Sequence, residues 1–412
     1  MIYTKTFDCG IKFAFKRTKS PVSYSALTVK SGTRNEPEQF GGIAHMTEHM
    51  LFKGTAKRTP QQICNRLEKL GGDLNAYTNK EETVLYATVL REDTPKAVDL
   101  LLELAFTSTF PQDELEKERN VVIDEINMYK DSPSECIFDD FERFLFSGHE
   151  LSNPILGTAA SLKKIKSEDI ARYVRENFIP ANMCLSIVGS MTQQRAEKIA
   201  ADAISKYVRE AGGQTRCYPP LEGGSLASGT RFEKNVCKKN HQVNCIMGAS
   251  AYSFYDSDRL AMILLSNILG GPSSNSRLNQ SLREKSALVY NVETVYTQYS
   301  DSGAFLIYFG CEKENLEECL SLIDKELDSV RENALSDREM KDAKRQLLGQ
   351  LAISSDSGES QALSMGKSML FFNRIMPDDE IRAKINAIDA EQLQRVAREV
   401  LCRERLSTLV YR

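Results

Sequence analysis

The sequence predicts an α+β fold of two tandem homologous domains, each a mostly antiparallel sheet covered by helices on one face. Three observations lead to this prediction. Strand-like runs and helical runs are segregated along the chain, the same order of elements occurs twice, and a break rich in Gly, Pro and Ser separates the two occurrences. Segregated runs favour helices packed on one side of an antiparallel sheet rather than alternating β-α units. With 412 residues, 41% of them hydrophobic, the chain is long enough for two cores.

The break lies at residues 211–229, where Gly, Pro and Ser cluster and no apolar period continues. Such a stretch is typical of a linker. It predicts an N-terminal domain of residues 1–210, the linker 211–229 and a C-terminal domain of residues 230–412.

The two halves have matching elements. Each begins with a strand-like run, continues with an amphipathic helix and a strand rich in Thr, Val and Tyr, and closes with helices. In the first half these elements are Tyr24–Lys30, Gly41–Phe52, Thr83–Leu90, Pro95–Phe106 and Glu114–Tyr129. In the second half they are His241–Ala251, Arg259–Leu269, Ala304–Gly310, Leu316–Asn333 and Asp337–Leu351. Pairing Glu114 with Glu339 puts the repeat offset near 225 residues and predicts an internal duplication.

Bulk composition disfavours several classes of protein. A net charge of −4 is unlike a dedicated nucleic-acid binder. No apolar run approaches the roughly 18 residues of a membrane helix, and the first residues do not resemble a secretory signal, so we expect a cytoplasmic protein. The ten cysteines are scattered without C-x-x-C spacing, which predicts reduced core thiols rather than a disulfide framework.

The first chemical motif is His45-Met-Thr-Glu48-His49, in a chain that has only four histidines. On a helix, His45, Glu48 and His49 fall within an arc of about 100°. Two imidazoles one turn apart are typical zinc ligands, and a neighbouring carboxylate that does not bind the metal can take a proton from water. The motif therefore predicts a zinc site with Glu48 as general base. The alternative is a helix with two solvated or hydrogen-bonded histidines.

The predicted helix Glu114–Tyr129 offers a third ligand. Glu118 and Glu125 lie at the edge of its apolar stripe, whereas Asp124 points the opposite way. Carboxylates beside a buried face are costly unless they are paired or bound to metal. We expect Glu125 to be the third ligand and Glu118 to support the site. The alternative is an ion-pair network with Arg119 or Lys117.

These residues resemble the pitrilysin, insulin-degrading enzyme and mitochondrial processing peptidase family of zinc peptidases, which carry the inverted H-x-x-E-H motif. The resemblance covers nearly the whole chain and is strongest in Gly32–Glu36 and His45–Thr55. The family has its third ligand 76 residues after the second histidine, a position filled here by Glu125. The pattern Glu-Arg-x-x-Val-x-x-Glu ends at the same residue. The second half has no such motif, so the resemblance implies one zinc ion per chain.

The resemblance also implies a substrate side. Asn75 and Ala76 match family residues that lie along the substrate backbone on an edge strand, and a plain hairpin is the alternative. Arg283 and Tyr290 match a family arginine and tyrosine that contact substrate from the half opposite the metal. Tyr290 is then a donor to the developing oxyanion, and packing is the alternative role for both residues. One departure is Ala287, where the family usually has glycine.

The expected function is a zinc metalloendopeptidase that hydrolyses peptides or unfolded polypeptide segments within an enclosed chamber. Glu48 would take the proton of the attacking water and pass it to the leaving amine, with Glu118 orienting the site. Family members of this length pair to enclose the chamber, so we expect a homodimer or a complex with a related second subunit, and neither nucleic acid nor a membrane as partner. The rival is a non-catalytic assembly subunit of the same family, which the intact motif disfavours.

Overall fold

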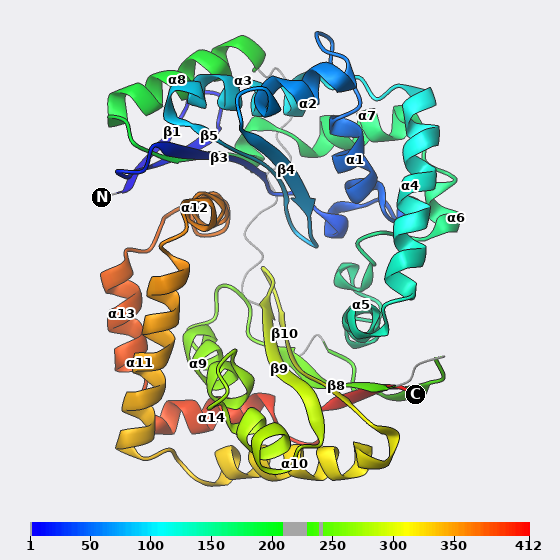
Figure 1. Ribbon diagram of the computed structural model, residues 1–412, viewed down its shortest axis with the longest axis vertical. Coiled ribbons are helices and arrows are strands. Elements are labelled where there is room, and N and C mark those ends of the chain that lie inside the picture. Colours follow the sequence, from blue (N-terminus) through cyan, green and yellow to red (C-terminus); the bar gives the residue numbers. More distant parts are fainter. Residues whose placement is uncertain (1, 209–228, 239–241) are drawn as a thin grey trace. The chain divides into compact units, whose positions relative to one another are not determined.

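The computed structural model describes residues 2–208, 229–238 and 242–412 (Figure 1). The described residues form two compact units. The first falls within Met1–Asn127, Asn153–Pro219 and Ile353–Met376, and the second within Met128–Ser152, Pro220–Ala352 and Pro377–Arg412. Each unit contains one sheet and one main apolar core, and each is described here by itself.

The sheet of the first unit has the strand order β1-β2-β6-β3-β5-β4. All neighbours are antiparallel except the parallel pair β2–β6. Its strands are β1 (Ile2–Thr6), β2 (Lys12–Arg17), β3 (Val22–Val29), β4 (Asp73–Thr78), β5 (Thr83–Leu90) and β6 (Met183–Gly189). Its helices are α1 (Ile43–Leu51), α2 (Pro60–Glu68), α3 (Thr94–Thr107), most of α4 (Gln112–Lys130), α6 (Ala159–Leu162), α7 (Ser167–Asn177), α8 (Gln193–Tyr207) and α12 (Gly358–Phe372).

The two faces of this sheet are chemically different because side chains alternate along each strand. Leu27, Val29 and Leu185 point into the main core beneath α3 and α8. The other face carries Thr28 and Ser186 and is covered by α12 (Figure 1). A Cβ on Gly366 of α12 would lie 2.2 Å from Thr28 Oγ1, and Ser186 donates a hydrogen bond to the Ala362 carbonyl at 2.6 Å. A glycine at the closest approach and a hydrogen bond from the sheet to a helix carbonyl thus let α12 lie on a polar sheet face.

The second unit has the strand order β7-β11-β8-β10-β9, again with one parallel pair, β7–β11. Its strands are β7 (Glu233–Val236), β8 (Val243–Ala251), β9 (Val289–Gln298), β10 (Gly303–Cys311) and β11 (Ser407–Tyr411). Its helices are α5 (Pro133–Leu145), α9 (Arg259–Gly270), α10 (Leu316–Glu332), most of α11 (Asp337–Ser354), α13 (Asp378–Ala387) and α14 (Ala390–Val400). This strand order matches β2-β6-β3-β5-β4 of the first unit, as a duplication predicts.

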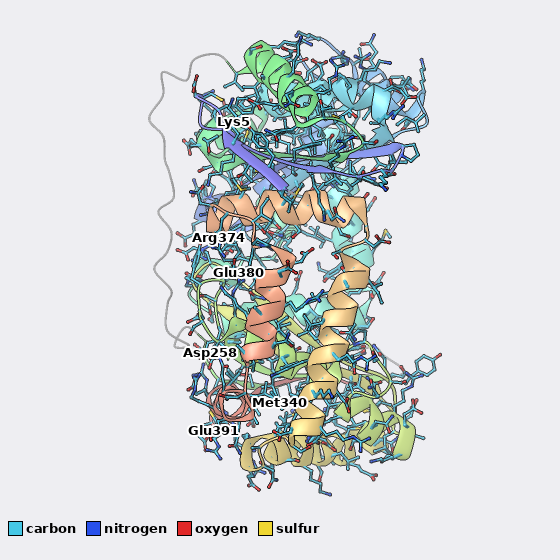
Figure 2. All side chains as sticks on the ribbon, turned by 90° about the vertical axis from the view of Figure 1, so that its left-hand side faces the viewer. Lys5, Asp258, Met340, Arg374, Glu380 and Glu391 are labelled. Atoms are coloured by element: carbon cyan, nitrogen blue, oxygen red, sulfur yellow. The ribbon has the colours of Figure 1, made fainter. Side chains whose placement is uncertain are left out.

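Helices cover both faces of the second sheet as well. α9, α10 and α14 lie over the main core, while α5 packs on the other face, where Ile137 and Phe141 share a smaller cluster with Ile246 and Leu306. α11 and α13 run side by side in this unit (Figure 2). Lys344 of α11 donates a hydrogen bond to the Asn386 carbonyl of α13 at 2.8 Å.

The predicted α+β class with two similar sheets is confirmed, and each predicted strand and helix is present with shifts of a few residues at its ends. The cover of the sheets differs from the expectation of helices on one face only, because α12 and α5 occupy the second faces. These two helices also come from the opposite half of the sequence.

The proposed linker lies outside the described residues except for Gly229, so the predicted domain limits stay a prediction. His241 also lies outside them. Among the described residues, no helix is both long and apolar enough to cross a membrane.

Candidate metal centre

Helix α1 carries His45, Glu48 and His49 and is anchored at its start. Gly42 precedes it with φ of +88°, a left-handed conformation that glycine adopts without strain. The Glu36 carboxylate accepts the backbone N–H groups of Gly42 and Ala44, each at 2.9 Å. These are N–H groups that the first turn of a helix leaves without partners. Burial raises the pKa of Glu36 to about 8, and the two hydrogen bonds oppose this shift.

Three donor atoms converge between α1 and α4. Glu125 Oε2 lies 3.8 Å from His45 Nε2 and 3.7 Å from His49 Nε2, and the ligand atoms of all three residues lie within 4.8 Å of one another. Tetrahedral zinc with bonds of about 2.0–2.2 Å holds its ligand atoms roughly 3.3–3.6 Å apart, close to this spacing. Burial lowers the pKa of His45 to about 3, so its imidazole is neutral, as a metal ligand must be. Two imidazoles and a carboxylate thus fit zinc.

Glu118 is buried on α4 and contacts His49, one of the candidate ligands. Its Oε2 lies 3.1 Å from His49 Nδ1, and its Oε1 lies 2.7 Å from Lys53 Nζ. A carboxylate on the second ring nitrogen fixes the orientation of a metal-binding histidine. The alternative network with Arg119 or Lys117 is wrong, because Arg119 donates to the carbonyls of Leu162 and Ile165, and Lys117 pairs with Glu114.

Glu48 faces the donor cluster from the same helix. Its Oε2 accepts a hydrogen bond from Thr78 Oγ1 at 2.6 Å. Burial raises the pKa of Glu48, and the Thr78 hydrogen bond opposes this shift. A half-buried carboxylate with a raised pKa is suited to accept and return a proton. Glu36, Lys53 and Thr78 were not assigned roles from the sequence. The partners of Lys53 and Thr78 are distant in the chain, whereas Glu36 contacts N–H groups only six and eight residues ahead.

The strand β4, which carries Asn75, Ala76 and Thr78, is the edge of the first sheet and pairs only with β5 among the described residues. Asn75 is exposed and donates to Asp73 Oδ2 at 2.6 Å, while Ala76 is half-buried on the face toward the core. An edge strand of this kind can accept an extended peptide by main-chain hydrogen bonding.

The stretch Gly32–Glu36 supports the end of this strand. A Cβ on Gly32 would lie only 2.2 Å from the Asn79 carbonyl oxygen, so only glycine allows the two backbones to approach. Arg34 Nη1 pairs with Glu81 Oε1 at 2.8 Å across the same turn. The stretch thus joins the β4–β5 turn to the segment that caps α1.

In the second unit, Arg283 lies in the π-helical segment Asn279–Lys285 and is half-exposed, with Glu284 Oε1 at 3.8 Å. Tyr290 is the second residue of β9 and has 89% of its surface exposed, so it is not a packing residue of this unit. Between them Ala287 has φ of +51°, a left-handed conformation that glycine adopts more readily. Both residues belong to the second unit, whereas the donor cluster belongs to the first.

His149 also belongs to the second unit. Its Nδ1 accepts the Leu151 backbone N–H at 3.2 Å, and its Nε2 lies 3.4 Å from Asp301. These contacts give His149 a local structural role. Among the described residues, the group of His45, His49 and Glu125 is the candidate metal cluster.

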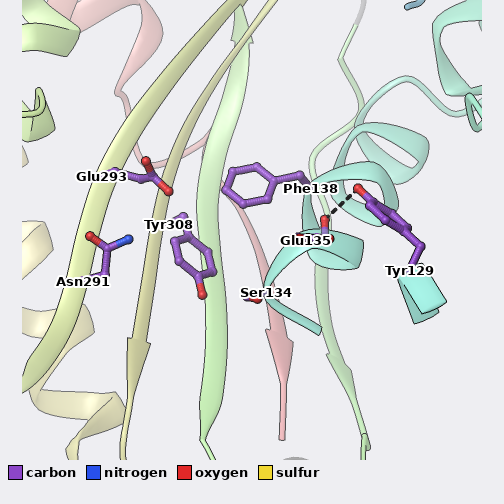
Figure 3. Close-up of a pocket in the computed structure, with 7 residues that line it drawn as sticks. All are labelled: Tyr129, Ser134, Glu135, Phe138, Asn291, Glu293 and Tyr308. Carbon is purple, nitrogen blue, oxygen red and sulfur yellow. Dashed lines mark hydrogen bonds between the residues drawn. The ribbon is translucent and has the colours of Figure 1, made fainter. Parts of the chain in front are cut away.

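A cavity of about 590 Å³ opens between α5, the end of α4 and the strands β9 and β10 (Figure 3). Tyr129, Phe138 and Tyr308 give it aromatic walls, and Glu135 and Glu293 give it negative charge. Such a lining suits a side chain with an apolar stem and a cationic end.

Comparison with known proteins gives two family matches and full-length relatives. Residues 12–159 match the insulinase family, peptidase family M16, and residues 164–347 match the peptidase M16 inactive domain. The chain is 29% identical over 411 residues to a protein of Bacillus subtilis named uncharacterized zinc protease YmxG, covering 100% of this chain and 98% of the relative. It is 30% identical over 372 residues to uncharacterized zinc protease SCO5738 of Streptomyces coelicolor, covering 90% and 81%.

Two solved structures share the fold. A peptidase M16 inactive domain from Pseudomonas fluorescens superposes with a TM-score of 0.89 at 21% identity, covering 100% of this chain and 98% of that chain. A protease from Helicobacter pylori gives a TM-score of 0.88 at 20% identity, covering 100% and 99%.

Proposed function

Because the chain belongs to peptidase family M16, we propose that it is a zinc metalloendopeptidase that hydrolyses peptides or unfolded polypeptide segments. One observation carries the proposal. The donor atoms of His45, His49 and Glu125 converge beside a half-buried glutamate, Glu48, that is not needed as a ligand. The zinc-protease names of the relatives support the choice of metal.

Each residue of the site has a distinct part in this proposal. Bound zinc would polarise the peptide carbonyl and make a water molecule more acidic. Glu48 takes the proton of the attacking water and returns it to the leaving amine. Glu118 and Lys53 hold the His49 ring in place, so that its Nε2 faces the metal position. The edge strand β4, at Asn75 and Ala76, aligns the peptide backbone, and one zinc ion is held per chain.

A non-catalytic assembly subunit is the competing function. The competing proposal predicts that purified protein cleaves nothing, with or without metal. Digestion of a mixed library of unstructured peptides, with and without a chelator, separates the two. We expect cleavage that is lost on chelation and restored by zinc, and absence of any chelator-sensitive cleavage would refute the peptidase.

We further propose that the protein works as a homodimer, or with a related second subunit, that encloses its substrate in a chamber. The exposed side chains of Arg283 and Tyr290 then contact the substrate bound at the zinc site of the partner. Tyr290 would donate to the developing oxyanion. In such a chamber, unstructured peptides are cleaved much faster than a stable folded protein of similar sequence content, and equal rates would refute the enclosure.

A mixing experiment tests the shared site. A Glu48→Gln chain and an Arg283→Ala chain, each impaired alone, are combined, and subunit exchange is verified by tagged pull-down. If sites are shared, a mixed dimer has one fully wild-type site, and activity rises toward half of wild type per mixed dimer. No recovery despite exchange would overturn the shared-site proposal and leave the zinc chemistry standing.

A further inference from the structure

We propose that Thr78 is a positioning residue for the base Glu48, holding it by one carboxylate oxygen and joining it to the strand β4. This inference rests on the proposed peptidase function. The contact is short, at 2.6 Å between Thr78 Oγ1 and Glu48 Oε2, as expected for a hydroxyl donating to a carboxylate. Thr78 is the last residue of β4, the strand proposed to align the substrate.

The Thr78 hydroxyl donates its single hydrogen to Glu48. A threonine has one hydrogen to donate, and the other nearby acceptor, Thr83 Oγ1, lies farther away at 3.5 Å. Thr83 cannot supply a hydrogen in return, because its own hydroxyl donates to the Ser31 carbonyl at 2.9 Å. Thr83 is also fully buried, so this arrangement is fixed.

The backbone next to Thr78 is held by hydrogen bonds within the β4–β5 turn and by packing against Gly32. Across the β4–β5 turn, Asn79 Oδ1 accepts the N–H groups of Glu81 and Glu82, each at 2.9 Å, and Gly32 packs against the Asn79 carbonyl. The branched threonine side chain is also restricted at χ1. The donor is therefore placed before substrate arrives, which is the condition for efficient positioning.

Holding Oε2 decides which oxygen acts as the base. Within the described residues, Glu48 Oε1 has no hydrogen-bond partner, so it is the oxygen available to accept the proton of water. Alternation along β4 puts Thr78 on the same face as Ala76, and Asn75 on the other face. A peptide aligned on this strand is thus placed in fixed relation to Oε1.

The test compares Thr78→Val, which keeps the branched shape without the hydroxyl, with Thr78→Ser, which keeps the hydroxyl. Thr88→Val on β5 is the matched control, because its hydroxyl faces the other side of the sheet. For Thr78→Val we expect kcat to fall about 10- to 100-fold with little change in KM. Thr78→Ser should stay within about threefold of wild type, and both variants should bind as much zinc as wild type.

Two further measurements separate positioning from substrate binding. In a Glu48→Gln background, Thr78→Val should lower turnover no further, because Thr78 acts through the base. The Kd of a fluorescent peptide should also be the same for Glu48→Gln and for the double variant. Unchanged kcat in Thr78→Val, equal loss in Thr78→Ser, or a Kd weakened as much as kcat falls would each overturn the inference.

The hydrogen bond itself is tested without turnover. In metal-free protein, the melting temperature of a Thr78→Val and Glu48→Leu double variant should fall by less than the sum of the two single shifts, because both changes remove the same contact. Additive shifts would overturn the positioning role even if wild type proved inactive. Inactivity of wild type toward all peptides refutes the proposed function instead, so the two failures are distinguishable.

Discussion

Replacing Glu118 by Gln should weaken zinc binding while leaving the three proposed ligands intact. Glu118 Oε2 lies 3.1 Å from His49 Nδ1, and Lys53 Nζ lies 2.7 Å from the other oxygen. A hydrogen bond to a charged group contributes about 1.5–3 kcal/mol. The amide keeps an acceptor oxygen but loses the charge, so we expect the lower end of this range. That end corresponds to about a tenfold loss of zinc affinity.

The assay is competition for zinc with a chromophoric chelator at fixed pH. Glu114→Gln is the matched control, because Glu114 lies one turn earlier on α4 and pairs with the exposed Lys117. At saturating zinc the Glu118→Gln protein should regain most of its turnover. Unchanged affinity in Glu118→Gln, or an equal loss in Glu114→Gln, would show that Glu118 does not orient His49.

The remaining predictions concern stability. Ala287→Gly should raise the free energy of unfolding by roughly 0.5–1 kcal/mol, because relief of the left-handed conformation exceeds the added backbone entropy of glycine. An unchanged or lower melting temperature in calorimetry would contradict this. Glu36→Ala should lower the free energy of unfolding by about 2 kcal/mol, since the N–H groups of Gly42 and Ala44 lose their acceptor. Urea unfolding measures the loss, and the exposed Glu38→Ala is the control, which should change little.

Many of the helices and strands follow from local periodic patterns of apolar residues in the sequence. The strand Thr83–Leu90 has the predicted bounds, and α4 buries Leu115, Val122 and Ile126 along the predicted apolar stripe. The position of Glu125 at the border of that stripe was predictable, because the 3.6-residue period of a helix assigns each residue to a face from its sequence position.

Other features depend on contacts between distant residues. Ser and Thr residues on the second face of the first sheet are typical of a face exposed to solvent. Nothing near them in the sequence indicates that α12 covers this face. Lys53 lies in the turn after α1, and its partner Glu118 is on another helix. The local sequence does not distinguish Thr78 from other threonines in strands. Its contact with Glu48 arises from the packing of β4 against α1. Periodicity predicts faces, whereas such pairs follow from tertiary packing.

The central claim is that Glu48 is the base of a zinc peptidase. The most direct measurement is turnover of an unstructured peptide by Glu48→Gln, made alongside the zinc content of the same preparation. The amide has the shape of the carboxylate but cannot take the proton, so turnover should fall on the order of 10²–10⁴-fold at wild-type zinc content. Near-wild-type turnover at full zinc occupancy would contradict the account.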